Sequence, residues 1–377
     1  MARQWFSWRG KWARKVLAPL TFGSLTGRSK AQQANPKPTL LRVTGLHRLA
    51  AAPVSVTVIF VHYHHRGLVT DGFKRLIRSS VEAGFRSLLV SSMISEEEIQ
   101  ELSSLNLAIA VRANYGYDFG SIREARDLLM KHDLLQSSRY VFINSSMLNI
   151  ASHGFGQDAF LDALANQSCG DDLLGITGSF EDRSYHIQTY FFSVSSKLFE
   201  SKAFGRFLGD YIRGLKVTKE SPRLYAIKNG ELKLTRFAIS QGMSVGTLLF
   251  NGGFPTIEDY ELMKELSGSL AKYLHVDFVG QRTKLHSLID DFSSEWMPSA
   301  GLQFNPSQSC WALLMAKGFL FIKREALELS DSRSIHAPSV CAMITPLMHQ
   351  LGISLPAWSD LNYLPKILFA PKAKSGS

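Results

Sequence analysis

The first half of the chain alternates between two hydrophobic periods. Val54 to Val61 is a run rich in β-branched residues and predicts a buried strand. Thr70 to Gly84 carries apolar residues at helical spacing, with a threonine that can cap the start of the helix and a glycine that can end it. The alternation continues with strands predicted over 87–90, 107–111 and 140–143, and with helices opening at Ser95 and spanning 121–135. Strands that alternate with helices of this length indicate right-handed βαβ units and a mainly parallel sheet.

The second half of the chain changes to an α+β pattern. Strands are predicted over 173–177 and 190–194, on either side of the polar segment 179–186, and helices over 196–215, 232–241 and 305–325. The expected fold is therefore α/β, a Rossmann-type mainly parallel sheet flanked by helices, followed by an α+β half. We expect three parts, namely an amino-terminal arm and linker at 1–48, an α/β half at 49–195 and a mostly helical half at 196–377.

The positive charge of the chain is concentrated at its amino-terminal end. The formal net charge is +10, and the first 48 residues hold ten Lys or Arg and no acid, so the rest of the chain is neutral. At helical spacing, one face of this arm is apolar and the opposite face is basic, with Trp5, Trp8, Trp12 and Val16 on the first and Arg3, Lys11 and Arg14 on the second. Such a helix suits the surface of an anionic bilayer. A disordered basic arm is the alternative, whereas Lys15 and Pro19 disfavour a secretory signal and the neutral body disfavours nucleic-acid binding.

Cysteine usage and hydropathy bear on the cellular compartment. Cys169, Cys310 and Cys341 show neither metal-ligand spacing nor a disulfide framework, which fits a reducing compartment. No run of 18 apolar residues occurs that could span a membrane. Together with the basic arm, these features predict a cytoplasmic protein that is peripheral at the inner face of the membrane.

A polar turn with two glycines lies between a predicted strand and the helix that follows it. It reads Arg112-Ala113-Asn114-Tyr115-Gly116-Tyr117-Asp118-Phe119-Gly120. Open α/β sheets bind ligands at the carboxyl ends of their strands, and polar residues follow all four predicted strands, at 62–65, 91–92, 112–118 and 144–146. Neither a GxGxxG fingerprint nor a P-loop motif occurs, so a nucleotide site at this edge has another design.

Four motifs stand in an order and spacing that match one protein family. They are NYGYDFGS at 114–121, FINSS at 142–146, YHIQTYF at 185–191, and Asn305-Pro306 followed by Trp311 and by FIKRE at 321–325. Together they resemble the rhamnan synthesis protein F family, bacterial glycosyltransferases that build rhamnose-containing polysaccharide. The resemblance covers residues 54–330.

The resemblance implies a GT-A-like fold and a nucleotide-diphosphate sugar donor, with rhamnose or another deoxyhexose as the sugar. The implied acceptor is a polysaccharide, a lipopolysaccharide or a lipid-linked glycan, and the 49–195 half would bind the donor while the 196–377 half binds the acceptor. The family also implies a divalent metal held by an acidic residue within the segment that here reads Asn144-Ser145-Ser146. Ser145 supplies no negative charge, so metal dependence and activity itself stay open. The alternatives are a catalytically inactive sugar- or glycan-binding relative acting as an assembly partner, and a glycan methyltransferase.

Asp118 is the first candidate for a catalytic residue, because a carboxylate at a strand end beside a glycine turn can hold the donor or a metal. The alternative is that Asp118 caps the helix over 121–135. Arg112 and Asn114 are predicted to contact the donor, or else to be solvated residues at the strand end. The other predicted donor-binding residues are Gly116, Tyr117, Asn144, Ser145 and Ser146.

The second half supplies candidates for the base and for the cations that inverting glycosyl transfer requires. His186 and Glu231 are the candidate catalytic groups, each with a structural role as its alternative. His186 and Gln188 alternate on an extended segment and therefore point to the same face, which suits sugar hydroxyls. Lys323 and Arg324 can neutralise a diphosphate, or else form a charged helix end.

A histidine run follows the first predicted strand and raises the question of a metal site. His64 and His65 are adjacent, and adjacent residues on a strand point to opposite faces. The sequence therefore argues against joint chelation of a metal by these two side chains.

Overall fold

The computed structural model describes residues 39–52, 55–151, 159–166, 170–181, 184–250, 305–324 and 337–363, with isolated residues between 256 and 266. By internal contacts the chain divides into Met1–Pro36 and Lys37–Ser377, and every element described below belongs to the second unit. The predicted membrane-binding helix lies outside the described residues.

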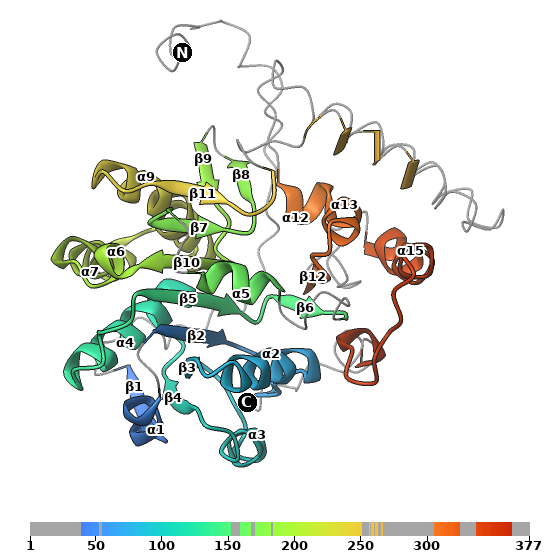
Figure 1. The fold of residues 1–377 in the computed structure, drawn as a ribbon. Helices are drawn as coiled ribbons and strands as arrows, with labels where there is room; N and C mark the ends of the chain where they lie inside the picture. The colour runs from blue at the N-terminus through green and yellow to red at the C-terminus, as the bar shows by residue number, and fades with distance from the viewer. Residues whose placement is uncertain are drawn as a thin grey trace, which may run out of the picture. The chain divides into compact units, whose positions relative to one another are not determined.

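Eight strands of the described part form one mixed sheet (Figure 1). Their order across the sheet is β1-β4-β3-β2-β5-β10-β7-β11. The bounds are β1 (Leu40–Thr44), β2 (Val56–His62), β3 (Arg86–Ser91), β4 (Ala108–Arg112), β5 (Arg139–Asn144), β7 (Leu173–Gly175), β10 (Phe191–Ser195) and β11 (Val245–Thr247). β4, β3, β2 and β5 run parallel to one another and β7 runs parallel to β11, whereas β1 and β10 are antiparallel to their neighbours. The predicted mainly parallel sheet is confirmed.

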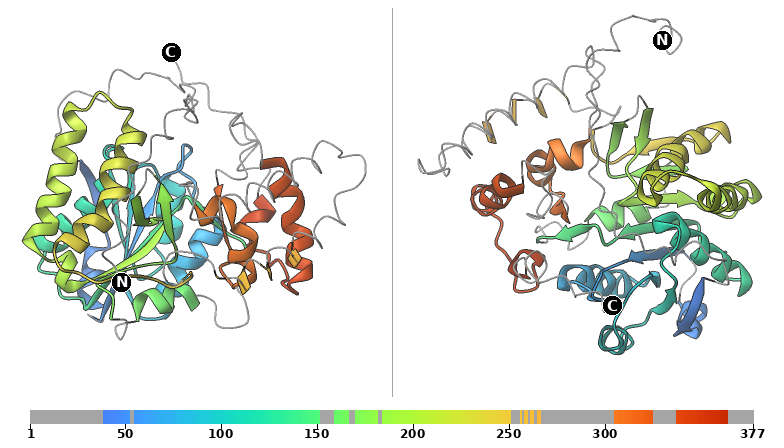
Figure 2. Two further views of the ribbon diagram at one scale, coloured as in Figure 1. Left: turned by 90° about the horizontal axis from the view of Figure 1, so that it is seen from above. Right: turned by 180° about the vertical axis from the view of Figure 1, so that it is seen from behind.

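Helices cover both faces of the sheet because its central strands are apolar on both sides. In β2, Val58 and Phe60 point into one buried core, while Ile59 and Val61 point into the other. The first core is covered by α2 (Asp71–Glu82), α3 (Glu96–Leu102), α5 (Ala159–Ala165), α13 (Trp311–Ala316) and α15 (Ala337–Gln350). The second is covered by α1 (Leu46–Ala51), α4 (Tyr117–Lys131), α6 (Ser196–Phe199), α7 (Lys202–Val217), α8 (Pro222–Ala226) and α9 (Leu232–Ser240). The left view of Figure 2 shows α7 and α9 on one side of the strands and α13 and α15 on the other. Within the described ranges, none of the helices has the length and apolarity needed to cross a bilayer.

The order of the central strands reverses at β2. The chain steps from β2 to β3 to β4 with α2 and α3 on one face, then returns through α4 on the opposite face to form β5 on the other side of β2. Right-handed crossovers require this change of face. The carboxyl ends of β2 and β5 therefore flank a topological switch point, which is where open α/β sheets bind ligands.

The predicted helix caps form at the two helices of the first face. The Thr70 hydroxyl accepts a hydrogen bond from the Phe73 N–H at the start of α2, and the Ser95 hydroxyl accepts one from the Glu98 N–H at the start of α3. Gly84 follows α2 with φ +76°, the left-handed conformation that ends helices. These local sequence signals therefore place both helices correctly.

Several elements of the described chain occur where the sequence predicted none. β1 lies within the 1–48 arm, and α1 spans its boundary. β1 was not predicted because it is an edge strand that is only partly buried and carries no apolar run. The polar segment 179–186 belongs to a hairpin of β8 (Gly178–Glu181) and β9 (Ser184–Ile187), which is likewise not marked by an apolar run.

The stretch predicted as one helix over 305–325 is divided into three elements, which corrects that prediction. α12 (Pro306–Ser309) and α13 are followed by Gly318 at φ +86°, and the chain then forms β12 (Phe321–Lys323). β12 pairs with β6 (Met147–Asn149), which directly continues the chain beyond β5, and Figure 1 shows the two strands side by side. Lys323 is therefore the last residue of a strand, and Arg324 follows it; neither ends the predicted helix. The pairing brings both residues to the carboxyl edge of the main sheet.

Candidate active site at the carboxyl edge of the sheet

A direct hydrogen bond joins the turn after β4 to the segment after β5. Asn144 Nδ2 donates to Asp118 Oδ2 at 2.9 Å, and Asn144 Oδ1 accepts from the N–H of Ser146 at 3.1 Å and from its hydroxyl. Because both donors of Ser146 face the amide oxygen, the amide nitrogen of Asn144 must face Asp118. The two segments expected to share one edge of the sheet therefore meet there.

The turn itself is shaped by glycine and by an unusual tyrosine conformation. Gly116 is the N-cap of α4 with φ +84°, and Tyr117 follows it with φ +50°, a conformation that costs a non-glycine residue free energy. α4 begins at Tyr117, four residues before the predicted start at 121, so Asp118 lies in its first turn and is not its cap. A Cβ atom at Gly120 would lie 2.4 Å from the Tyr115 carbonyl oxygen, so close packing requires this second glycine.

Arg112 binds the turn from inside the protein. Its side chain is 1% exposed, and its guanidinium donates to the Tyr115 carbonyl and, at 3.1 Å, to the Ser121 hydroxyl. Burial lowers the pKa of Arg112 to about 10, and the nearby Glu124 and Asp118 carboxylates oppose that shift. A further hydrogen bond runs from the Arg112 guanidinium to the Ser92 hydroxyl after β3, at 3.4 Å. On the turn itself, Asn114 and Tyr117 are exposed.

A second carboxylate, that of Glu231, lies near enough to Asp118 to act on it electrostatically. Glu231 ends η2, a π-helix over Ile227–Glu231, and its Oε1 accepts a hydrogen bond from the Thr189 N–H at 3.3 Å. Burial raises the pKa of Asp118 to about 6, the Asn144 hydrogen bond acts against that rise, and the negative charge of Glu231 adds to it. The structure thus brings together two of the three predicted catalytic residues, and one of them titrates near neutral pH.

Ser145 fastens the loop after β2 to the end of β5. The Ser145 hydroxyl accepts from the Tyr63 N–H at 3.1 Å and donates to the Tyr63 carbonyl at 3.3 Å. A carboxylate at this position could accept the first bond but could not donate the second. The serine therefore has a positive structural role at the switch point, and it holds Tyr63 with its ring partly exposed.

Arg324 reaches the same edge through β12. Its N–H donates to the Ser146 carbonyl at 2.9 Å, and its positive charge contributes to lowering the pKa values of His62 and His64. Burial is the largest cause for both histidines, and each pKa falls to about 4, so both rings are neutral at pH 7. His62 Nε2 donates to the Leu68 carbonyl and Nδ1 accepts from the Ser91 hydroxyl, which fixes the ends of β2 and β3 together.

The prediction about the histidine run rested on a wrong premise. β2 ends at His62, so His64 and His65 are not strand residues, and their ring centroids lie 4.6 Å apart instead of on opposite faces. Within the part of the chain that the structure describes, no cluster of three or more His, Cys, Asp and Glu side chains is arranged to hold a metal ion.

His186 and Gln188 lie deeper in the protein than a solvent-facing sugar site requires. His186 is fully buried in β9, opposite Ser179 in the hairpin. Gln188 accepts from the Thr177 hydroxyl at 2.8 Å and donates to Asn305 Oδ1 at 2.7 Å and to the Ser307 hydroxyl at 3.2 Å. The amide of Gln188 therefore ties the hairpin to the start of α12, a contact between segments that are 117 residues apart.

The donor set at this edge does not fit a metal held by protein side chains. Asp118 Oδ2 is engaged by Asn144, and the hydroxyl at position 145 is engaged by the backbone of Tyr63. Hard divalent cations prefer several carboxylate oxygens, and Asp118 and Glu231 are the two carboxylates that this geometry brings together. The metal implied by the family resemblance therefore has no ready set of ligands among these residues.

Sequence reasoning missed two of the residues that build this edge. Tyr63 and Thr189 carry the contacts to Ser145 and Glu231. The signal for Tyr63 was its place in the polar segment after the first strand, because every such segment proved to lie at the switch point. No local signal marks Thr189, whose role depends on a backbone N–H.

Comparison with known proteins gives distant likenesses. No protein-family model matches the chain, so membership of the rhamnan synthesis protein F family is not confirmed. An uncharacterized protein, y4gN of Sinorhizobium fredii (strain NBRC 101917 / NGR234), is 27% identical over 204 residues, which are 52% of this chain. The match spans about half of that relative, 49% of its length.

Comparison with solved structures also gives weak similarities. The similar structures include core-mannan synthase A from Aspergillus fumigatus in its Mn/GDP form (TM-score 0.31, 8% identity, 52% of this chain and 73% of that one). A putative nucleotide-diphospho-sugar transferase from Desulfovibrio desulfuricans G20 has a TM-score of 0.27 at 12% identity, over 51% of this chain and 79% of that one. TarS of S. aureus, residues 1–349, has a TM-score of 0.29 at 12% identity, over 84% and 86%. TM-scores this low carry no inference about fold or activity.

Proposed function

We propose that this protein is a GT-A-like glycosyltransferase that moves a sugar, rhamnose or another deoxyhexose, from a nucleotide-diphosphate donor to a polysaccharide or lipopolysaccharide acceptor. The observation that carries the proposal is the Asp118–Asn144 hydrogen bond, which places a carboxylate of pKa about 6 beside the switch point of the sheet. The resemblance of the segments 114–121 and 142–146 to one transferase family supports the same conclusion, because these two segments are the ones that meet.

Asp118 acts as the general base in this proposal. In an inverting displacement the acceptor hydroxyl attacks the anomeric carbon, the bond to the diphosphate oxygen breaks, and Asp118 takes the hydroxyl proton. A base is most effective when its pKa lies near the working pH, and burial brings Asp118 to about 6. Glu231 accepts hydrogen bonds from acceptor hydroxyls in this proposal.

The donor lies along the edge between the turn and the end of β5. Asn114 and Tyr117 are exposed on the turn, and Gly116 allows close approach to its backbone. Asn144, Ser145 and Ser146 form the opposite wall. Lys323 and Arg324 supply the positive charge for the leaving diphosphate, a role that protein cations can fill without a metal. Arg112 positions the turn through its buried contacts.

The acceptor-side roles rest on the second half of the chain. We place the donor with residues 49–195 and the acceptor with residues 196–377, from which Glu231 reaches Asp118. His186 and Gln188 support this side from within the core, because their hairpin carries the Thr189 N–H that binds Glu231.

The test is nucleotide release from candidate donors. The full-length protein is incubated with nucleotide-diphosphate deoxyhexoses and hexoses, with acceptor glycan and with EDTA or a divalent cation, and free nucleotide is measured. Release that depends on the acceptor and persists in EDTA is expected. Donor binding without release under any of these conditions would contradict the proposal.

A non-catalytic sugar-binding relative is the second candidate, and one observation favours it. Ser145 stands where the family carries an acidic residue, and its hydroxyl is committed to the Tyr63 backbone. Such a protein would bind the nucleotide sugar and act as a partner in glycan assembly. The nucleotide-release assay separates the two candidates, because only the enzyme turns the donor over.

We also propose that the amino-terminal arm holds the protein at the cytoplasmic face of the inner membrane. Tryptophans on one helical face and cations on the other suit an anionic lipid surface. Deleting residues 1–30 is expected to move most of the protein from the membrane fraction to the soluble fraction, measured by sedimentation of cell lysates. A deletion variant that still sediments with membranes would show that the arm is not the attachment.

A further inference from the structure

A basic pocket lies among the helices α7, α8 and α9, which cover the second core of the sheet. Its volume is about 590 Å³, within the range of roughly 300–1,000 Å³ that holds small organic ligands. Gly214 and Thr218 at the end of α7, Glu220 and Tyr225 before and within α8, and the η2–α9 segment form its walls. That last segment contributes Lys228, Asn229, Leu232, Lys233 and Arg236.

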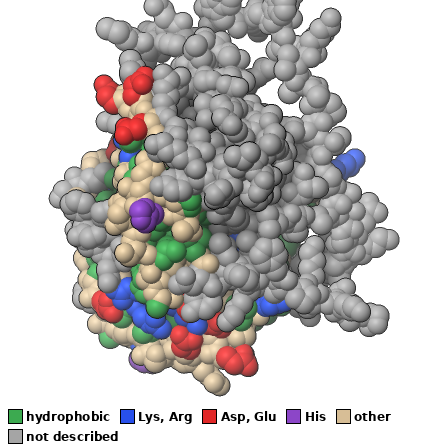
Figure 3. Space-filling model, turned by 90° about the vertical axis from the view of Figure 1, so that its right-hand side faces the viewer, with side chains coloured by type: hydrophobic (Ala, Val, Ile, Leu, Met, Phe, Trp, Pro, Cys, Tyr) green, Lys and Arg blue, Asp and Glu red, His purple; other side chains and the backbone are tan. Residues whose placement is uncertain are grey.

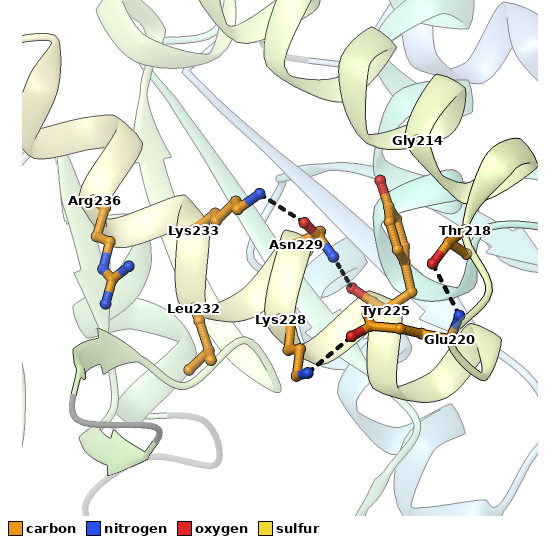
Figure 4. Close-up of a pocket in the computed structure, with 9 residues that line it drawn as sticks. All are labelled: Gly214, Thr218, Glu220, Tyr225, Lys228, Asn229, Leu232, Lys233 and Arg236. Carbon is orange, nitrogen blue, oxygen red and sulfur yellow. Dashed lines mark hydrogen bonds and ion pairs between the residues drawn. The ribbon is translucent and has the colours of Figure 1, made fainter.

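The lining of this pocket is rich in cations and in hydrogen-bond donors. Lys228 pairs with Glu220 at 2.8 Å, and Lys233 donates to Asn229 Oδ1 at 2.6 Å (Figure 4). Lys233 and Arg236 are exposed, so both side chains can be reached by a ligand from solvent. With three cations and one carboxylate among the lining residues, the basic pocket has a net positive charge.

The positive charge is concentrated in residues 202–236 and is not a property of the folded chain as a whole. Residues 202–236 hold nine Lys or Arg and three Asp or Glu, although residues 49–377 together are neutral. On the face seen in Figure 3, by contrast, the described Lys and Arg side chains lie beside acidic ones. Cations concentrated around a pocket raise the local concentration of anionic ligands.

Short hydrogen-bond links connect the basic pocket to the turn that carries Asp118. The Tyr225 hydroxyl, at the wall of the pocket, donates to the Tyr211 carbonyl at 2.9 Å. The Tyr211 hydroxyl in turn donates to the Gly116 carbonyl at 3.1 Å. The π-helix over Ile227–Glu231 contributes to both places. Lys228 and Asn229 line the basic pocket, and Glu231, the last residue of the π-helix, acts on Asp118 in the candidate active site. π-Helical turns are often found at functional sites.

We propose that the basic pocket binds a phosphate group of an organic ligand. Two exposed cations suit the several oxygens and the double charge of a phosphate better than a single carboxylate. If the proposed transferase function holds, this phosphate belongs to a phosphorylated acceptor; its other source is the headgroup of an anionic phospholipid. No residue of this pocket takes part in the donor site described above.

The experiment measures binding of two probes by the full-length protein. Inorganic pyrophosphate is titrated by calorimetry, and vesicles of phosphatidylcholine with and without phosphatidylglycerol are tested by sedimentation. The Lys233→Glu/Arg236→Glu variant is expected to bind pyrophosphate at least about tenfold more weakly than the unaltered chain. Its thermal melting curve is expected to be unchanged, because both side chains are exposed.

The matched control changes the same charge on the same segment outside the pocket. Lys216 and Lys219 are exposed and do not line it, so the Lys216→Glu/Lys219→Glu variant is expected to change pyrophosphate affinity by less than about twofold. Equal losses in both variants, or no loss in the pocket variant, would overturn the proposal.

The vesicle arm identifies the source of the phosphate. Because the amino-terminal arm of the full-length protein is itself proposed to bind anionic lipid, the two charge variants are compared with each other. If the pocket variant binds phosphatidylglycerol vesicles more weakly than the control variant, the phosphate is that of a lipid headgroup. If the two variants bind these vesicles equally while only the pocket variant loses pyrophosphate binding, the phosphate is that of a soluble or glycan-linked ligand. Both outcomes support a phosphate site. Neither calorimetry nor vesicle sedimentation measures turnover, so the result is independent of the nucleotide-release test.

Discussion

Replacing Asp118 by Asn is expected to lower the rate of sugar transfer by about a hundredfold to ten-thousandfold, the usual contribution of a general base. Asparagine has the same shape, and its amide oxygen can accept the hydrogen bond that Asn144 donates at 2.9 Å. The turn should therefore keep its structure while it loses the proton acceptor. The measurement is kcat in the nucleotide-release assay, with the urea midpoint of unfolding as the control for folding.

The pH profile distinguishes a base from a residue that only shapes the turn. Burial raises the pKa of Asp118 to about 6, so the unaltered enzyme should lose activity as pH falls through 6 and reach a plateau above it. The residual activity of Asp118→Asn should lack this step. Asp127→Asn is the matched control, because Asp127 lies on the same helix with a side chain 42% exposed and should leave rate and profile unchanged. Full activity in Asp118→Asn would remove Asp118 from the mechanism.

The sign of the effect on stability also follows from the raised pKa. The folded-state pKa of Asp118 lies above the value of 3.8 expected when the chain is unfolded, so the folded state binds the proton more tightly. The contribution of this group to stability is greatest below pH 4 and is lost as pH rises through 6. At pH 7 the Asp118→Asn variant should therefore be at least as stable as the unaltered chain.

Replacing Asp360 by Ala is expected to lower the free energy of unfolding by about 3 kcal/mol, because it leaves buried donors without an acceptor. Asp360 is 0% exposed in η6, a 3₁₀-helix over Asp360–Tyr363. Its carboxylate accepts at 2.8 Å from the Gly72 N–H at the start of α2 and at 2.8 Å from the Asn149 N–H in β6, and at 3.1 Å from the Thr70 hydroxyl. One side chain thus ties the carboxyl-terminal part of the described chain to the first face of the sheet.

The measurement is urea unfolding at pH 7, with Asp360→Asn as the control that conserves shape. The amide oxygen of the introduced asparagine keeps one acceptor, while its NH₂ group faces a backbone donor. The free energy of unfolding should therefore fall by less in Asp360→Asn than in Asp360→Ala. Burial raises the pKa of Asp360 to about 6 despite its hydrogen bonds, so this carboxyl favours the folded state most below pH 4 and progressively less up to pH 6. A loss below about 1 kcal/mol for Asp360→Ala would show that these hydrogen bonds do not hold the segment.

The elements between residues 54 and 144 could be predicted because their signals are local. Continuous apolar runs mark buried parallel strands, and helical spacing with Thr70 and Ser95 as caps marks the helices between them. The start of α4 was misplaced because it depends on positive φ values at Gly116 and Tyr117, and a tyrosine in that conformation has no sequence signature.

The elements that were missed depend on partners far away in the chain. β12 consists of three residues, and its pairing with β6 joins segments more than 170 residues apart. Within 305–325 the apolar residues fit a helical period as well as a strand, and only the register with Met147–Asn149 decides between them. The same applies to β1, which becomes a strand by pairing with β4.

The sequence alone determined the alternation of strands and helices and the polar ends of the strands, and it predicted a site at the turn around Asp118. The tertiary structure decided what surrounds that carboxylate: Asn144 as its donor, Glu231 as its neighbour, Ser145 bound to Tyr63, and Arg324 at the same edge. The reason is that the order of strands in the sheet, not distance along the chain, sets which side chains meet. Burial at that meeting point then raises the pKa of Asp118 to about 6, which an aspartate does not possess by its identity alone.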